Sequence, residues 1–331
     1  MHERASGTRT SILRLLVVLG AAAGLHAQQP QQPELPSAPG RLIDIGGRKL
    51  HVICTGQGAP TVVFEAGASS FAIDFTFVQR EVSGTNRVCA YDRAGMGWSD
   101  PAGDGTSTSG DLHKLLTALT EPPPYVLVGA SRGGLMVRTY VLDHPDEVGG
   151  LVLVDPSSED RLFTMVEGKA LAIAAATPEQ IKQNAPREAV NVPRRKPQTG
   201  APFDKLPPDL YRLRVLLDER LIASIPDTVP AAAVAAAQES ERAYLARLLA
   251  SRSTATHPLG DRPTVVLSRG DERNAGREEA HAALAALSTT SRHTIVAGAG
   301  HEIHLFEPAA VAQAIHDVVT SLRTKTPLPP R

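Results

Sequence analysis

Short apolar runs alternate with amphipathic stretches along most of this chain. The runs are rich in Val, Ile and Leu, as expected of strands that are buried on both faces of a sheet. Between them, apolar residues recur every three to four positions, which is the helical period. This alternation predicts a mostly parallel sheet flanked by helices. We expect strands at 41–45 and 50–54, joined as a hairpin through Gly46 and Gly47. Further strands are expected at 61–67, 87–92, 125–128, 151–155, 263–268 and 293–298. The expected helices are 72–82, 111–119, 134–142, 277–287 and 309–322.

The alternation stops between residues 156 and 262. This stretch is rich in Ala, Arg, Leu and Glu and has no strand-like run, so it predicts helices around 159–174, 178–184, 209–221 and 231–249. Since it is inserted between two strands of the sheet, we expect it to form a helical cap over one edge. The predicted organisation is a core of residues 41–155 and 263–325 and a cap of residues 156–262.

The N-terminal residues carry a different pattern. Arg4, Arg9 and Arg14 precede an apolar run at 15–25, and small residues end at Ala27. This pattern predicts a secretory signal peptide at 1–27, with an uncleaved anchoring helix as the alternative. The run is shorter than the roughly 20 residues of a membrane span. A Pro/Gln-rich spacer at 28–40 follows, and we expect a secreted or periplasmic protein with no membrane span after cleavage.

Composition and charge indicate which kind of molecule the protein binds. The 34 Lys and Arg residues are balanced by 35 Asp and Glu residues, so no surface for nucleic acid is indicated. The sequence also lacks the short motifs of metal and nucleotide sites. We therefore expect a small-molecule substrate, no metal and no cofactor, while the oligomeric state is not indicated.

Cys54 and Cys89 each lie in a strand-like apolar run. In an oxidising compartment they could form a disulfide, and otherwise they would be two small buried side chains. Both alternatives stay open at this point.

Ser131 has a glycine two positions away on either side, at Gly129 and Gly133. The strand YVLV precedes this G-x-S-x-G sequence and an apolar helix follows, which is the strand-turn-helix setting of a nucleophilic serine. Side chains at the two glycines would collide with the adjoining strand and helix. The start of the helix directs backbone N–H groups toward the serine, where they favour developing negative charge. The pattern predicts that Ser131 is a nucleophile.

A serine hydroxyl needs a neighbouring base, and His301 is the strongest candidate. It follows the strand expected at 293–298 in a glycine-containing loop, ahead of the last helix. His304, three residues later, is expected to be a packing or surface residue.

The chain resembles the α/β-hydrolase-fold enzymes. The resemblance rests on TVVFEAGASS, RVCAYDRAGMGWSD, LVGASRGG, HPDEVGGLVLVDP, PTVVLSRGD and AGAGHEIHLFEP, which occur in the order of that family. It implies an eight-stranded, mostly parallel sheet and a triad whose acid lies between the nucleophile and the histidine in the sequence. The acid is either Asp155, after the strand 151–155, or Asp271, after the strand 263–268. We favour Asp155, because the carboxylate that orients the histidine should be shielded from solvent, whereas Asp271 lies in the charged sequence SRGDERN, which is typical of a solvent-exposed loop. Alternatively, Asp155 has only the structural role of holding neighbouring loops together.

The resemblance also implies an oxyanion hole formed by the backbone N–H groups of Ala68 and Arg132. Arg132 departs from the bulky apolar residue that is common at this position. Its guanidinium either reaches into the pocket and favours an anionic or carbonyl-bearing substrate, or turns outward to a carboxylate. Glu65 is expected near the site without an assigned role, Arg93 is expected to be structural, and Trp98 is a candidate pocket residue.

Together these features predict an exported serine hydrolase that cleaves a small-molecule carboxylic ester through an acyl-serine intermediate. An amide or N-terminal peptide hydrolase with the same triad is the first alternative. A non-catalytic ligand-binding protein of the same fold is the alternative from another class, and a lyase or transferase of this fold is a third.

Overall fold

The computed structural model describes residues 34–103, 106–166, 169–272 and 274–330. The predicted signal peptide at 1–27 and the first part of the spacer lie outside these residues. Among the helices of the described ranges, none has both the length and the apolar character needed to cross a membrane.

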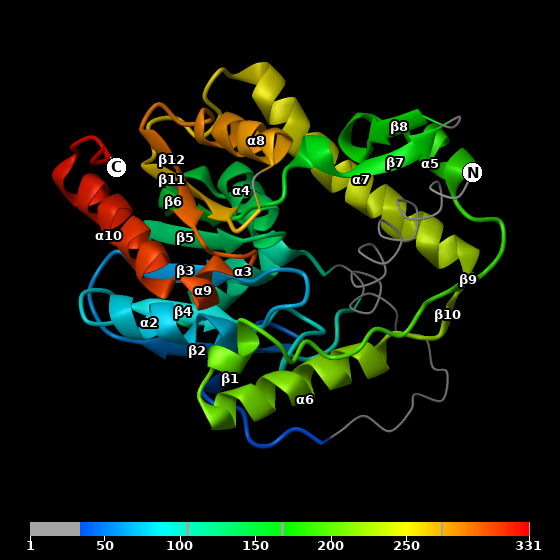
Figure 1. The fold of residues 1–331 in the computed structure, drawn as a ribbon, viewed down its shortest axis with the longest axis horizontal. Coiled ribbons are helices and arrows are strands. Elements are labelled where there is room, and N and C mark those ends of the chain that lie inside the picture. The colour runs from blue at the N-terminus through cyan, green and yellow to red at the C-terminus, as the bar shows by residue number, and fades with distance from the viewer. Residues whose placement is uncertain (1–33, 104–105, 167–168, 273, 331) are drawn as a thin grey trace.

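An eight-stranded sheet forms the centre of the molecule, in the order β1-β2-β4-β3-β5-β6-β11-β12 (Figure 1). The first two pairings are antiparallel and the others are parallel. This is the sheet predicted from the apolar runs, and the fold class is confirmed. The strands are β1 (Arg41–Asp44), β2 (Lys49–Thr55), β3 (Val62–Glu65), β4 (Val88–Tyr91), β5 (Tyr125–Ala130), β6 (Val148–Val154), β11 (Thr264–Gly270) and β12 (Ser291–Ala297).

Strand β6 begins three residues before its expected start at 151 because two glycines belong to it. A Cβ atom on Gly149 would lie 2.6 Å from Leu322, and one on Gly150 would lie 2.5 Å from Val318. The last helix therefore packs closely on the backbone of this strand, and a side chain at either glycine would require it to shift.

Helices cover both faces of the sheet and separate the core into two apolar layers. On one face, α2 (Thr76–Val82) and α10 (Pro308–Thr324) pack together, next to the short helices η1 (Ala72–Phe75) and α9 (Ile303–Phe306). The other face is covered by α3 (Thr108–Ala118), α4 (Gly133–Asp143) and α8 (Ala275–Ala285).

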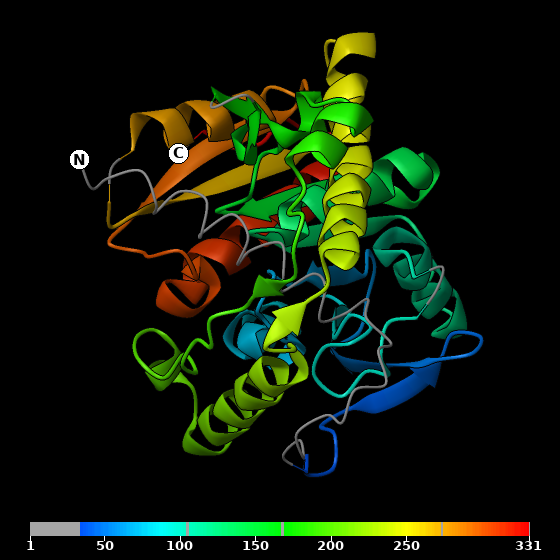
Figure 2. The same ribbon diagram turned by 90° about the vertical axis from the view of Figure 1, so that its right-hand side faces the viewer.

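The segment between β6 and β11 lies beside the sheet, and Figure 2 views the molecule from that side. Its helices α5 (Pro178–Asn184), α6 (Pro208–Ser224) and α7 (Ala231–Thr254) are close to the predicted ones. The short strands β9 (Val190–Asn191) and β10 (Thr228–Val229) pair beside them.

The helix predicted at 159–174 is wrong. The chain there forms the 3-10 helices η3 (Glu159–Arg161) and η4 (Ile173–Ala175), separated by an antiparallel pair of strands, β7 (Phe163–Val166) and β8 (Lys169–Ala172). Phe163, Thr164 and Val166 are aromatic or β-branched and favour strands, a preference that the high alanine content of the segment obscured. The inserted segment is thus mixed rather than purely helical.

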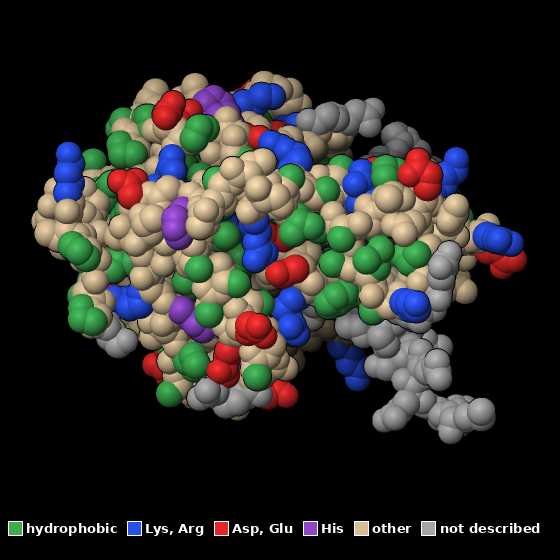
Figure 3. All heavy atoms as spheres, turned by 90° about the horizontal axis from the view of Figure 1, so that it is seen from above, with side chains coloured by type: hydrophobic (Ala, Val, Ile, Leu, Met, Phe, Trp, Pro, Cys, Tyr) green, Lys and Arg blue, Asp and Glu red, His purple; other side chains and the backbone are tan. Residues whose placement is uncertain are grey.

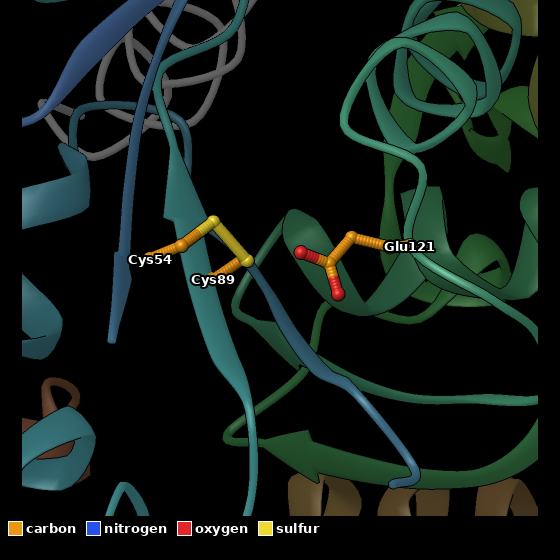
Figure 4. A group of neighbouring side chains, drawn as sticks. All are labelled: Cys54, Cys89 and Glu121. Atoms are coloured by element: carbon orange, nitrogen blue, oxygen red, sulfur yellow. A yellow bond between two sulfur atoms is a disulfide. The ribbon is translucent and has the colours of Figure 1, made fainter. Parts of the chain in front are cut away.

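Cys54 and Cys89 are paired residues on the neighbouring strands β2 and β4, and a disulfide joins them (Figure 4). The carboxylate of Glu121 lies nearby, where it accepts hydrogen bonds from Thr61 Oγ1 at 2.8 Å and Arg87 Nε at 2.9 Å. Because the sulfur atoms are bonded to each other, this group is a covalent link and not a set of metal ligands.

Acidic and basic side chains are interspersed on the face shown in Figure 3, without a large area of one sign. This distribution agrees with the balanced composition of the chain.

Candidate active site

Ser131 occupies the sharp turn between β5 and α4, at the carboxyl end of β5. Its φ of 52° lies in the left-handed region, which costs energy for any residue but glycine. A Cβ atom on Gly129 would lie 2.6 Å from the carbonyl oxygen of Gly133, and one on Gly133 would lie 2.2 Å from that of Glu65. Neither position admits a side chain, so the two glycines permit the turn that presents Ser131.

Asp155 and His301 meet at the same edge of the sheet. Asp155 directly follows β6, and its Oδ2 lies 2.5 Å from Nδ1 of His301, which comes from the loop after β12. The other carboxylate oxygen, Oδ1, accepts the backbone N–H of Arg269 at 3.1 Å. The Asp155 side chain is 4% exposed and that of His301 is 40% exposed. The buried carboxylate of Asp155 thus contacts the solvent-accessible imidazole of His301.

The pKa of Asp155 lies below its ordinary value. Burial by itself raises this pKa, but the hydrogen bond and charge of His301 and the N–H of Arg269 lower it by more. Asp155 is therefore a carboxylate at neutral pH and accepts from the Nδ1–H of His301.

Ser131 is attached to the Asp155 turn through its backbone. The N–H of Ser131 donates to the carbonyl of Val154, and the N–H of Ser157 donates to the carbonyl of Ser131, both at 2.9 Å. In the described part of the chain, no hydrogen bond joins the Ser131 hydroxyl to His301. The two side chains extend from the turn after β5 and the loop after β12.

Asp271, the other candidate acid, has a different environment. Its side chain is 45% exposed, and Nε of Arg269 lies 4.0 Å from its carboxylate. Within the described ranges it makes no hydrogen bond or ion pair with His301. The structure therefore brings Asp155 to the histidine and leaves Asp271 in solvent, as the sequence SRGDERN suggested.

The loop that contains Ala68 packs against Ser131. A Cβ atom on Gly67 would lie 3.4 Å from Cβ of Ser131. Across the described residues, neither the N–H of Ala68 nor that of Arg132 donates to a protein acceptor. Both amides are thus available to a ligand beside the serine.

Arg93 holds this loop in place and accounts for Glu65. Its Nη1 donates to Oε1 of Glu65 and to the carbonyl of Ala66, both at 2.6 Å, and its Nη2 donates to the carbonyl of Gly67 at 2.7 Å. Tyr91 donates to the second oxygen of the Glu65 carboxylate. Burial raises the pKa of Glu65, and Arg93 opposes this effect. Glu65 is the buried counter-ion of an arginine that fixes two carbonyls of the Ala68 loop.

Arg132 turns away from the serine and toward the inserted segment. Its Nη1 and Nη2 donate to the two carboxylate oxygens of Glu241 on α7, at 2.8 and 2.5 Å. The exposed fractions of the two side chains are 16% and 4%. Of the two orientations considered from the sequence, the structure has the outward one.

Arg214 on α6 was not singled out from the sequence, where an arginine in an amphipathic helix reads as solvated. Its side chain is fully buried, forms an ion pair of 3.0 Å with Asp74, and donates to the carbonyl of Ser69 at 2.9 Å. Both long helices of the inserted segment therefore contact residues next to the candidate site, α7 through Arg132 and α6 through Ser69.

Two further residues named from the sequence, His304 and Trp98, contact aromatic rings in this structure. His304 is buried and stacks on Phe75 with ring centroids 4.7 Å apart, and burial lowers its pKa to about 3. Trp98 packs against His51 at 4.9 Å and donates to the carbonyl of Pro36. It packs against an apolar cluster that includes Met96 and, from α6, Leu217.

Comparison with known proteins agrees with this architecture. The profile of the family described as alpha/beta hydrolase fold matches residues 60–308. A protein named YqjL from Bacillus subtilis is 24% identical over 272 residues, which are 80% of this chain and 85% of that protein. A solved esterase from Exiguobacterium antarcticum superposes with a TM-score of 0.55 at 18% identity, covering 86% of this chain and all of that one (100%).

Other relatives match over shorter stretches. The Hormonema carpetanum protein named "Probable transporter efuK" is 36% identical over 129 residues, which are 36% of this chain and 18% of that protein. The chain likewise spans 46% of the length of YbdG from Bacillus subtilis and 30% of a Schizosaccharomyces pombe relative.

Proposed function

Since the chain belongs to the alpha/beta hydrolase fold family, we propose that it is a serine hydrolase that cleaves a small-molecule carboxylic ester through an acyl-serine intermediate. The observation that carries the proposal is the 2.5 Å contact between Asp155 and His301, beside the strained turn that presents Ser131. The solved esterase with the same fold supports the choice of an ester.

In this mechanism, the Ser131 hydroxyl attacks the ester carbonyl while Nε2 of His301 takes its proton. Asp155 accepts the Nδ1–H of His301, which fixes the tautomer and stabilises the imidazolium that forms. The N–H groups of Ala68 and Arg132 bind the oxyanion. The imidazolium then protonates the departing alcohol, and water cleaves the acyl-serine with His301 again as the base. The contact between Ser131 and His301 closes when substrate binds, because such contacts are often long in free enzymes.

Labelling with a fluorophosphonate probe tests the nucleophile. We expect the probe to modify Ser131 of the wild-type protein and to leave the Ser131→Ala variant unlabelled and without esterase activity. The Ser83→Ala variant, changed at the end of α2, is the matched control and should label normally. Full esterase activity of Ser131→Ala would disprove the mechanism.

The substrate class is tested with p-nitrophenyl esters of increasing acyl length beside aminoacyl anilides. Turnover of esters with a maximum at one chain length supports the ester hydrolase and measures its pocket. Faster turnover of the anilides would instead identify the amide hydrolase. If no substrate is turned over and Ser131 is not labelled, the protein binds its ligand without catalysis.

We further propose that the protein is exported. The arginines and apolar run of residues 1–27 support this, as does the Cys54–Cys89 disulfide, a bond that persists mainly in oxidising compartments. Expressed with residues 1–331 in a Gram-negative host, the protein should appear in the periplasm with Gln28 at its N-terminus. A Val18→Glu variant should stay unprocessed in the cytoplasm. An uncleaved wild-type protein in the membrane fraction would instead support the anchoring helix.

A further inference from the structure

A group of two histidines and one glutamate lies at the opposite end of α4 from Ser131. It consists of His113 on α3, His144 at the end of α4, and Glu147 in the 3-10 helix η2 (Pro145–Glu147). The donor atoms of the three side chains all lie within 4.8 Å of one another. The 11 residues of α4 separate this group from the nucleophile by about 16 Å.

The distances within the group are close to those of a metal site. Nδ1 of His113 lies 3.1 Å from Oε1 of Glu147, and Nδ1 of His144 lies 4.0 Å from the same oxygen. Two donor atoms bound to one tetrahedral zinc ion are about 3.3 Å apart, given bonds of about 2.0–2.1 Å. The first pair already has this spacing. The second pair is wider than this spacing, and 24% of the His144 side chain is exposed.

The two imidazole rings stack in parallel, with centroids 4.2 Å apart and an interplanar angle of 4°. Both histidines lie within ion-pair distance of Glu147, His113 at 3.1 Å and His144 at 4.0 Å. Because the lone pair of a ligating nitrogen lies in the plane of its ring, a shared ion requires one imidazole to turn out of this parallel stack.

Tyr140 orients the carboxylate. Its hydroxyl donates to Oε2 of Glu147, while Nδ1 of His113 lies 3.1 Å from Oε1 and 3.2 Å from Oε2. Ligating carboxylates are commonly held by such a hydrogen bond from an outer residue.

We propose that His113, His144 and Glu147 form a binding site for a transition-metal ion of the zinc class, with a fourth position open to water. Two imidazoles and one carboxylate suit Zn²⁺, Cu²⁺ or Ni²⁺, whereas Mg²⁺ and Ca²⁺ prefer all-oxygen sites. The bound ion links α3 to the connection between α4 and β6, and so stabilises the folded chain without taking part in the chemistry at Ser131. No sequence motif marks the site, because His113 comes from a helix distant in the sequence from the other two ligands.

Calorimetric titration of ZnCl₂ into tag-free, chelator-treated protein tests the site. We expect one zinc ion per chain and loss of this binding in the His113→Ala/His144→Ala double variant. The His257→Ala/His316→Ala double variant, changed at two histidines outside the group, should bind as the wild type does. The His301→Ala variant should also retain the site, which separates it from metal binding at the candidate active site. Wild-type binding stoichiometry and affinity in the His113/His144 double variant, or no binding to the wild type at millimolar zinc, would overturn the proposal.

Three further measurements distinguish ligand loss from unfolding. Far-UV circular dichroism of the metal-free double variant should match that of the metal-free wild type; if it does not, the His113→Asn/His144→Asn variant replaces it in the titration. The Tyr140→Phe variant should bind zinc about 10-fold more weakly, the effect of losing an outer hydrogen bond. Cobalt added to the wild type should give visible absorption bands of a four-coordinate site, and bands of six-coordinate aqueous cobalt alone would contradict the proposed ligands.

Discussion

At the scale of single residues, the burial of the side chain distinguishes Asp155 from Asp271. Asp155 is 4% exposed and bonded to His301, whereas Asp271 is 45% exposed and faces Arg269. We expect Asp155→Asn to lower kcat on the order of 10³–10⁴-fold, because an asparagine favours the wrong imidazole tautomer. Asp271→Asn, the matched control, should keep kcat near the wild-type value. The measurement is steady-state hydrolysis of a p-nitrophenyl ester, and a larger loss in Asp271→Asn would reverse the assignment.

The sequence identified both candidate acids but could not choose between them by distance. Each follows a parallel strand at the same edge of the sheet, so topology places both near the histidine loop. What separates them is the path of the backbone after each strand. The N–H of Asp155 donates to Leu267 of the neighbouring strand, which folds the carboxylate inward, whereas the N–H of Asp271 donates to Ala299 of the histidine loop.

At the scale of elements, the Arg132–Glu241 pair connects the start of α4 to α7. Removing one partner of a mostly buried ion pair leaves the other charge without compensation, at a cost of about 3–5 kcal/mol. We expect Glu241→Gln to approach that loss in unfolding free energy and to lower kcat/KM, since Arg132 also supplies a proposed oxyanion donor. Urea unfolding and ester hydrolysis measure the two effects.

The same helix offers a matched control for this prediction. Glu239 pairs with Arg242 on the surface of α7, and its side chain is 40% exposed. Glu239→Gln should change the unfolding free energy by less than about 1 kcal/mol. Equal effects of Glu239→Gln and Glu241→Gln would show that the contact to Arg132 does not join α7 to the candidate site.

The strands were predictable from the sequence where all of their residues are buried. Strands β3, β5 and β6 are apolar on both faces, and the apolar run alone marks them. The strands β7 and β8 were missed because they pair only with each other, outside the central sheet, in a segment whose alanines favour helix. Arg214 was missed because Asp74 and Ser69, two of its partners, come from a distant part of the chain.

At the scale of the whole molecule, acid should weaken the attachment of the inserted segment. Glu159 of η3 is fully buried and is bonded to Arg138 of α4 at 2.7 and 2.8 Å and to Arg252 of α7 at 3.2 Å. Burial by itself raises the pKa of Glu159, but the two arginines lower it from 4.5 to about 2. Because the folded pKa lies below the unfolded one, this carboxylate stabilises the protein above pH 4.5 and loses that effect as pH falls toward 2.

The urea midpoint measured from pH 7 to pH 3 checks this dependence. The midpoint should fall as the pH drops below the pKa of an ordinary glutamate. It should fall less steeply in Glu159→Gln than in the wild type, since the amide does not titrate. Parallel curves for the two proteins would assign the acid sensitivity to other groups.

The disulfide acts on the whole chain because it restricts the unfolded state. Cys54 and Cys89 are 35 residues apart in the sequence, and closing a loop of that length is worth about 2–4 kcal/mol. We expect the Cys54→Ser/Cys89→Ser double variant to lose that amount of unfolding free energy in urea while β2 and β4 stay paired through their backbones. Dithiothreitol should bring the wild type to the level of the double variant and leave the double variant unchanged. If the reductant destabilised both proteins equally, its effect would not come from this bond, and the support that the disulfide lends to export would be lost.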